Sequence, residues 1–233
     1  MVTFPRQIAH QIRHVLRLGE GDQVAVLDNS GIKYTIIIQV ELPEQTLTGQ
    51  IIAAEAVPSE PNTHVALYFG LSSREKVEMI LQKGTEVGVG SFSPFISSRT
   101  LVVTTDLSKS KHDRWGRIIQ EAAEQSGRGR LPLLNPPENL TDCFLKANKE
   151  HDLCLIAWEK ASDDGFGLPE LQEKFSGKSI ALFVGPEGGF SDDEVAAAIE
   201  AGSQVVSLGA RILRMETAAI VFPALVLYEL GAL

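Results

Sequence analysis

The stretch Leu182-Phe-Val-Gly-Pro-Glu-Gly-Gly-Phe190 decides the fold of the larger part of this chain. An apolar run ends there in a glycine-rich turn, and Ser191-Asp-Asp-Glu194 follows directly as a capping box. The box predicts a helix over residues 191–201, where Gly202 ends it. A buried strand that turns directly into a capped helix is a building unit of α/β domains.

A second stretch of similar design, Leu208-Gly-Ala-Arg-Ile-Leu-Arg-Met-Glu-Thr-Ala218, lies closer to the C-terminus. It ends a short apolar run at 204–208 and leads into an apolar helix predicted at 217–230. Loops at the carboxyl ends of neighbouring strands form a crevice, and open α/β sheets bind their ligands in such crevices. We therefore expect a ligand site between the loops 185–189 and 208–218.

From residue 64 onward, apolar strand candidates alternate with amphipathic helix candidates. This alternation predicts an α/β domain with a parallel sheet and helices on both faces. The last helix is apolar all round, so we expect it to be covered on every side. The strands are predicted at 65–69, 91–96, 153–158, 180–184 and 204–208, and the helices at 73–87, 111–125, 191–201 and 217–230.

Residues 22–57 favour β structure instead. Short strands at this spacing favour a small barrel. The segment 57–62 contains two prolines and no periodicity, which indicates a linker between domains at residues 1–60 and 64–233. The barrel strands are predicted at 23–27, 32–40 and 46–56, with turns at 28–31 and 42–44.

The composition is typical of a globular protein, with 44% hydrophobic and 22% charged residues in a chain of 233. Cys143 and Cys154 show neither a disulfide pattern nor metal-ligand spacing, so we expect buried thiols, a reducing compartment and no metal. The N-terminus lacks the apolar run of a signal peptide, and 218–233 is too short to span a bilayer. We expect a cytoplasmic protein without a membrane partner.

The net charge of −9 argues against strong non-specific binding of nucleic acid. Basic residues nevertheless cluster at 6–17, 109–117 and 128–130, whereas acidic residues dominate 41–60 and 163–173. A basic face on an acidic protein therefore remains open.

The charges around the loop 185–189 do not suit a phosphate. Glu187, Asp192 and Asp193 would repel it, and no lysine follows as in a P-loop. A neutral or cationic ligand fits better, although a tight turn without a ligand requires the same glycines. In the second loop, Arg214 and Glu216 either form an ordinary surface ion pair or belong to a site.

Together the two stretches resemble the signature of RsmE-type methyltransferases, members of the SPOUT superfamily that modify N3 of a uridine in 16S ribosomal RNA. The resemblance covers nearly the whole chain in the right order. It includes residues 10–22, 82–89 and 121–132. Pro94 and Arg99 match a loop that reads Pro…Glu-Arg in the family, so Ser98 is a departure.

The resemblance implies a C-terminal SPOUT domain with a trefoil knot, preceded by a small PUA-like β-barrel domain that binds RNA. It also implies S-adenosylmethionine as methyl donor, 16S ribosomal RNA of the small subunit as partner, and a homodimer. A cofactor with a sulfonium cation and no phosphate agrees with the acidic loop. The implied cofactor-binding residues are Gly185, Pro186, Glu187, Gly188, Gly189, Leu208, Gly209, Ile212, Leu213, Arg214, Thr217 and Ala218, with a third loop near 157–160.

Methylation at N3 requires removal of the proton that this nitrogen carries. Glu216 is the candidate base, and it is equally a candidate for holding the knot together. Arg214 or Arg128 is the candidate for stabilising negative charge on the uracil carbonyls. Candidate RNA contacts are Arg6, His10, Arg13, Arg17, Arg128 and Arg130, with a solvated loop as the alternative for 128–130.

Three other functions remain open. A SPOUT ribose 2′-O-methyltransferase has a similar glycine loop, but residues 208–214 lack its late Leu-Asn-x-Ser motif. A non-catalytic RNA-binding or ribosome-assembly protein would not need intact cofactor loops. A nucleotide-binding fold predicts a phosphate loop after its first strand, where residues 69–74 contain one glycine.

Overall fold

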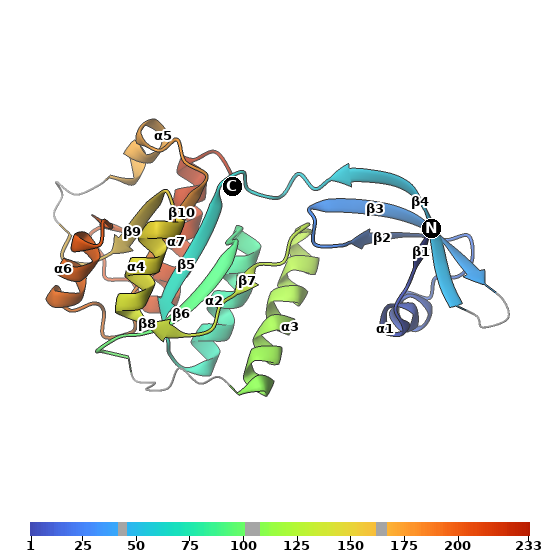
Figure 1. Cartoon of the computed structure of the whole chain (residues 1–233), viewed down its shortest axis with the longest axis horizontal. Helices are drawn as coiled ribbons and strands as arrows, with labels where there is room; N and C mark the ends of the chain where they lie inside the picture. Colours follow the sequence, from blue (N-terminus) through green and yellow to red (C-terminus); the bar gives the residue numbers. More distant parts are fainter. Residues whose placement is uncertain (42–45, 101–107, 162–166) are drawn as a thin grey trace. The chain divides into compact units, whose positions relative to one another are not determined.

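The computed structural model describes residues 1–41, 46–100, 108–161 and 167–233. By their contacts these residues form two compact units (Figure 1). The first unit consists of Met1–Glu60 and Gly127–Arg130, and the second of Pro61–Ser126 and Leu131–Leu233. The short segment 127–130 therefore leaves the second unit and returns to it, which no sequence signal indicated.

The first unit contains a four-stranded antiparallel sheet with the order β1-β4-β3-β2. The strands predicted at 23–27, 32–40 and 46–56 are confirmed, and the turn predicted at 42–44 lies outside the described residues. A helical segment near the N-terminus was not predicted, and its Ile12 packs into the core of this sheet. The elements are β1 (Val2–Thr3), α1 (Arg6–His10), η1 (Gln11–Val15), β2 (Gln23–Leu27), β3 (Ile32–Glu41) and β4 (Thr46–Ala56).

The second unit is built on a seven-stranded sheet with the order β11-β9-β10-β5-β6-β7, in which β8 also pairs with β6. Its described strand pairs are all parallel, and each strand predicted in this part of the chain is found. The strands are β5 (His64–Gly70), β6 (Ser91–Ile96), β7 (Leu133–Leu134), β8 (Glu138–Asn139), β9 (Leu153–Ala157), β10 (Ser179–Val184) and β11 (Gln204–Val206).

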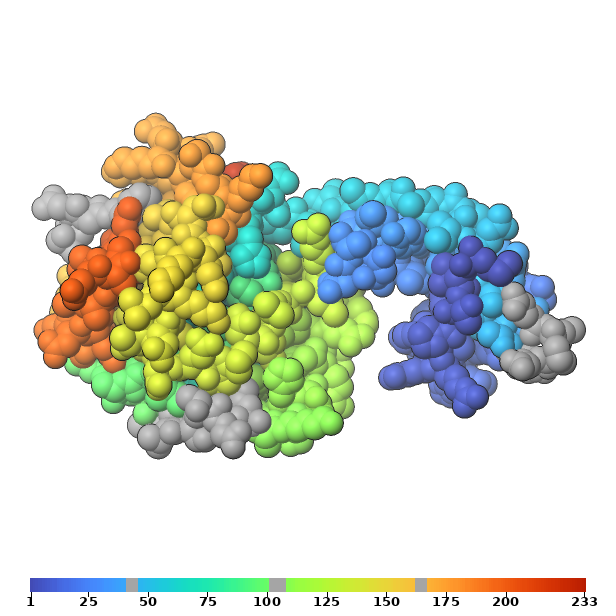
Figure 2. Space-filling view, viewed as in Figure 1, coloured from blue at the N-terminus to red at the C-terminus, as the bar shows by residue number. Residues whose placement is uncertain are grey.

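Helices cover both faces of this sheet, which confirms the predicted α/β arrangement. Val65, Leu67 and Phe69 face one layer, whereas Ala66 and Tyr68 face the other, because successive strand side chains point to opposite sides. Helices α4 (Leu140–Glu150) and α6 (Asp192–Glu200) form the layer turned toward the reader in Figure 2. The other layer contains α2 (Arg74–Val87), α3 (Lys109–Ser126), η2 (Leu168–Glu170), α5 (Leu171–Lys174) and α7 (Met215–Glu229).

The expectation that the last helix is covered on every side is wrong for the single chain. Phe222 and Val226 of α7 are fully buried against the sheet, but Tyr228 is 69% exposed and Leu225 is 36% exposed. The sheet, α2, η2 and α5 pack against this helix and leave an apolar outer stripe open to solvent.

The two cysteines are buried free thiols, as expected. Burial raises the pKa of both Cys143 and Cys154 to about 12. The thiols are therefore protonated and unreactive at neutral pH. Within the described residues, no helix has the length and apolar character needed to cross a membrane.

Candidate functional site

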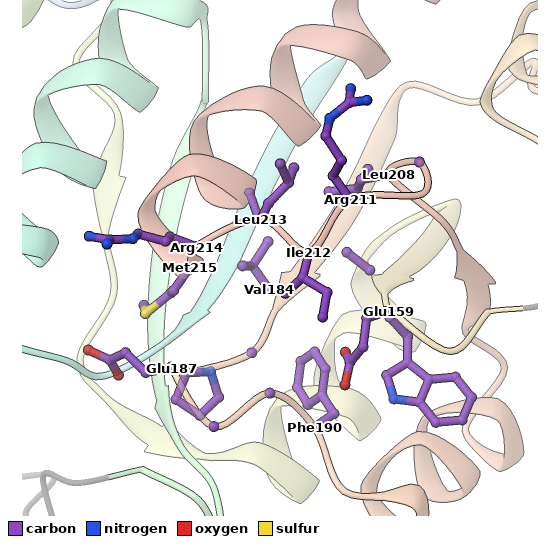
Figure 3. A pocket seen from close by; sticks show the side chains of 18 of the residues that line it. Glu159, Val184, Glu187, Phe190, Leu208, Arg211, Ile212, Leu213, Arg214 and Met215 are labelled. Carbon is purple, nitrogen blue, oxygen red and sulfur yellow. The ribbon is translucent and has the colours of Figure 1, made fainter.

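A cavity of about 420 Å³ lies at the carboxyl ends of β9, β10 and β11 (Figure 3). Its volume is in the range of small-ligand sites. The two stretches singled out in the sequence form most of its wall, and the expected third loop contributes residues 157–159. The lining residues are Lys76, Ala157, Trp158, Glu159, Val184, Gly185, Pro186, Glu187, Gly188, Gly189, Phe190, Leu208, Gly209, Arg211, Ile212, Leu213, Arg214, Met215 and Ala218.

The glycine loop between β10 and α6 is tightly packed against the end of β5. The amide of Gly189, whose φ is +65°, donates to the Pro186 carbonyl over 2.8 Å and closes the turn. A Cβ on Gly70 would lie only 2.6 Å from the backbone nitrogen of Pro186. This close approach requires glycine at the end of β5, and the sequence contained no signal for it.

Arg99 holds the same loop from the segment that follows β6. Its guanidinium donates to the Gly188 carbonyl over 2.9 Å and to the Phe190 carbonyl over 3.1 Å. Arg99 was noted in the sequence only as part of a family resemblance. The structure makes it a positioning residue for the cavity wall.

The second loop presents its side chains in different directions. In Figure 3, Ile212 points toward the centre of the cavity, as does the Glu159 carboxylate of the third loop, whereas the guanidinium groups of Arg211 and Arg214 point away from it. Arg214 occupies the N-cap position of α7 without a capping hydrogen bond from its side chain, and its backbone carbonyl accepts a hydrogen bond from the amide of Ala218 over 2.8 Å. Arg214 and Glu216 do not form the surface ion pair considered above.

Lys76 of α2 connects the two loops. Its ammonium lies 3.0 Å from Oε1 of Glu187 and 3.7 Å from Oε2 of Glu216. The hydrogen bond to Glu187 raises the pKa of Lys76. Burial raises the pKa of Glu187, but hydrogen bonds from Ser72 and Lys76 outweigh it and the pKa is lowered overall. Sequence reasoning missed Lys76 and Ser72, because a lysine on a polar helix face is indistinguishable from a solvated one.

The predicted cofactor-binding residues line the cavity with the exception of Thr217, which is exposed on α7. Of the predicted catalytic residues, Arg214 lines it and Glu216 lies just behind the wall. Arg128 belongs to the first unit, where its side chain is 5% exposed and Nη2 lies 3.0 Å from Oε2 of Glu60.

The predicted RNA contacts lie in the first unit. Arg6, His10 and Arg17 are exposed, and Arg13 is half-buried. The guanidinium of Arg130 donates to the Ser30 carbonyl over 3.3 Å.

The capping box predicted at α6 is confirmed, and Glu194 has a second task. Its carboxylate accepts from the amides of Ser191 (2.8 Å) and Ser98 (2.9 Å) and from the Ser98 hydroxyl (2.8 Å). Burial raises the pKa of Glu194, but these hydrogen bonds lower it further than burial raises it. Ser98, the departure from the family pattern, is thereby tied to the start of α6.

Glu194→Gln is expected to destabilise the protein at neutral pH by about 1 kcal/mol, the usual contribution of a helix cap. Because the folded pKa lies below its usual value of 4.5, this stabilisation is complete above pH 4.5 and is lost as pH falls through the folded pKa. Urea unfolding at about pH 7 and about pH 3 should show a difference that shrinks in acid. Glu200→Gln, at the exposed end of the same helix, is the control; equal effects of the two variants would contradict this role.

Comparison with known proteins assigns the chain. A family model described as an RNA methyltransferase domain matches residues 59–227. "Ribosomal RNA small subunit methyltransferase E" of Bacillus subtilis is 32% identical over 219 residues, which cover 90% of this chain and 82% of that protein. The protein of the same name from Synechocystis is 34% identical over 232 residues, covering 100% of this chain and 73% of the relative.

Solved structures agree with this assignment. The crystal structure of a ribosomal RNA small subunit methyltransferase E from Neisseria gonorrhoeae, bound to S-adenosylmethionine, is 29% identical. It superimposes with a TM-score of 0.81 over 97% of this chain and 91% of that one. The resemblance seen in the sequence is confirmed, and the chain belongs to the small-subunit methyltransferase E family of RNA methyltransferases.

Proposed function

We propose that this protein transfers a methyl group from S-adenosylmethionine to N3 of a uridine in the 16S ribosomal RNA of the small subunit. The observation that carries the proposal is the cavity between the loops 185–189 and 208–218, where both halves of the family signature meet. The names of the two relatives, and the cofactor held by the N. gonorrhoeae protein, support it.

The lining of the cavity suits this cofactor. Phe190, Ile212 and Leu213 offer apolar surface for an adenine ring, and the loop 185–189 offers backbone groups. The carboxylate of Glu159 is compatible with a sulfonium or ammonium group and would disfavour a phosphate, whereas the carboxylate of Glu187 is paired with Lys76. When bound, S-adenosylmethionine supplies a methyl group on positively charged sulfur.

The chain must remove the N3 proton and stabilise the negative charge that develops on the uracil. We assign the second task to Arg214, which is exposed at the cavity and has no acid within ion-pair distance among the described residues. Glu216 does not line the cavity and faces Lys76, which favours a role in holding the loops together over a role as base. The pairing of Arg128 with Glu60 favours a structural role in the first unit.

We further propose a PUA-like barrel that binds RNA at residues 1–60 and a knotted SPOUT domain at 64–233. The exposed Arg6, His10 and Arg17 support the first assignment. The second is supported by the path of the chain: β11 lies at the sheet edge beside β9, yet α7 packs on β10, β5 and α2. The apolar outer stripe of α7 supports a homodimer. A molecular mass of one chain in sedimentation equilibrium would contradict the dimer.

Ribosomal RNA from cells that lack this protein should lose one N3-methyluridine in 16S, and the purified protein should restore it on small subunits. Nucleoside mass spectrometry measures both. If the amount of N3-methyluridine is unchanged in cells that lack the protein, the proposal is contradicted. If the purified protein restores a ribose methyl group instead, the reaction is 2′-O-methylation. Calorimetry that detects no binding of S-adenosylmethionine would favour a non-catalytic RNA-binding protein.

A further inference from the structure

A second cleft, of about 310 Å³, lies between α2 and α3 and has a strongly basic lining. Four cationic side chains and one carboxylate face it, although the chain as a whole has a net charge of −9. It contains part of the basic cluster 109–117, which the proposed methyl transfer does not use. The lining residues in the described part of the chain are Arg74, Glu78, Ser110, Lys111, Arg114 and Arg117.

Glu78 holds two of the cations in fixed positions. Arg114 donates to both of its oxygens, with Nε at 2.5 Å and Nη2 at 2.8 Å, and Nε of Arg74 lies 2.8 Å from Oε1. The hydrogen bond from Arg114 is the main cause that lowers the pKa of Glu78 to about 2, so the carboxylate stays charged. Each guanidinium has five N–H donors, and Glu78 accepts only some of them. Glu78 therefore leaves N–H donors of Arg74 and Arg114 available to an anion.

The other two cations extend the cleft along α3. Lys111, Arg114 and Arg117 are three residues apart and share one face, about 4.5 Å apart along the helix axis. Lys111 lies over the Trp115 ring, with Nζ 4.9 Å from the centroid. Neither Lys111 nor Arg117 has an acid within ion-pair distance in the described residues. A line of cations suits a chain of phosphates better than a single small anion.

We propose that this cleft binds the phosphate backbone of the RNA substrate, an inference that rests on the proposed function. Lys76 lines the methyl-transfer cavity, whereas Arg74 and Glu78 line the cleft. At 100° per residue, these positions lie on opposite sides of α2. A helix with its side chains is about 10 Å wide. About three stacked nucleotides, at about 3.4 Å each, span this distance. The cleft therefore holds phosphates near the uridine that enters the cavity.

The test compares two double variants that each remove two positive charges. Lys111→Gln with Arg117→Gln changes the cleft, and Lys149→Gln with Lys178→Gln changes exposed lysines elsewhere on the second unit. Binding of deproteinised 16S ribosomal RNA is measured over a series of salt concentrations. The cleft variant should weaken binding about tenfold at low salt and reduce the slope of log K against log salt by about 1.4. The control variant should match the wild type.

Two further measurements separate the cleft from the cofactor site. The cleft variant should raise KM for small subunits, while the affinity for S-adenosylmethionine in calorimetry stays unchanged. If the cleft variant unfolds at a lower temperature than the wild type, Arg117→Glu replaces it, because this single substitution also changes the charge by two. It should give the same loss of RNA affinity. Equal salt slopes for cleft and control variants would overturn the proposal, even if the enzyme methylates normally. If the wild type does not methylate, the proposed function fails, and the salt slopes still decide whether the cleft binds RNA.

Discussion

Gly70→Ala is expected to weaken binding of S-adenosylmethionine at least about tenfold, because the added methyl group meets the backbone of the glycine loop. The new Cβ would lie 2.6 Å from the nitrogen and 2.8 Å from Cα of Pro186. Backbone atoms cannot move aside as a flexible side chain can, so the loop 185–189 must shift. The fold should lose about 1–3 kcal/mol of stability from the same overpacking. Calorimetry with S-adenosylmethionine and urea unfolding measure the two effects.

Gly116→Ala is the matched control for this change. It adds the same methyl group in α3, where a Cβ would meet no atom within 4 Å. Because alanine favours helix more than glycine does, Gly116→Ala should stabilise the protein by about 0.5–1 kcal/mol and leave cofactor binding unchanged. Wild-type affinity in Gly70→Ala would show that contact with β5 does not shape the cavity.

Arg214→Ala is expected to lower kcat for methylation of small subunits about 100-fold or more, with cofactor affinity within a few-fold of the wild type. The loss of one donor to a developing negative charge typically has an effect of this size. Arg214 lines the cavity, and its exposed side chain has no ion-pair partner in the described residues, so its removal should not lower the unfolding temperature. Single-turnover kinetics and calorimetry separate the two quantities.

Arg214→Lys tests whether the charge alone is sufficient. Lysine keeps the positive charge but lacks the planar fork of the guanidinium, so we expect an intermediate rate. If Arg214→Ala has the same kcat as the wild type, this residue takes no part in the chemistry. A large fall in cofactor affinity with unchanged kcat would instead make it a binding residue.

The cavity wall was predictable to the extent that its residues are contiguous in sequence. The loops 185–189 and 208–218 each follow a strand, and the strands of a parallel sheet end at one edge. The roles of Gly70, Lys76 and Arg99 were missed because each contacts the glycine loop from another strand end or helix. Many lysines on helices are simply solvated, and many glycines after strands simply form turns. Only the neighbours of Lys76 and Gly70 in space show that these two residues support the cavity.

The sequence by itself determined the local structure around the opening stretch: β10, the glycine turn, the Ser191–Glu194 capping box and α6. These features depend on hydrogen bonds and side-chain spacing within four residues, so short-range patterns specify them. Only the tertiary structure decided that β11 lies beside β9, that Lys76 bridges Glu187 and Glu216, and that Arg128 pairs with Glu60. Such contacts join residues far apart in sequence, and their positions depend on how whole strands and helices pack together.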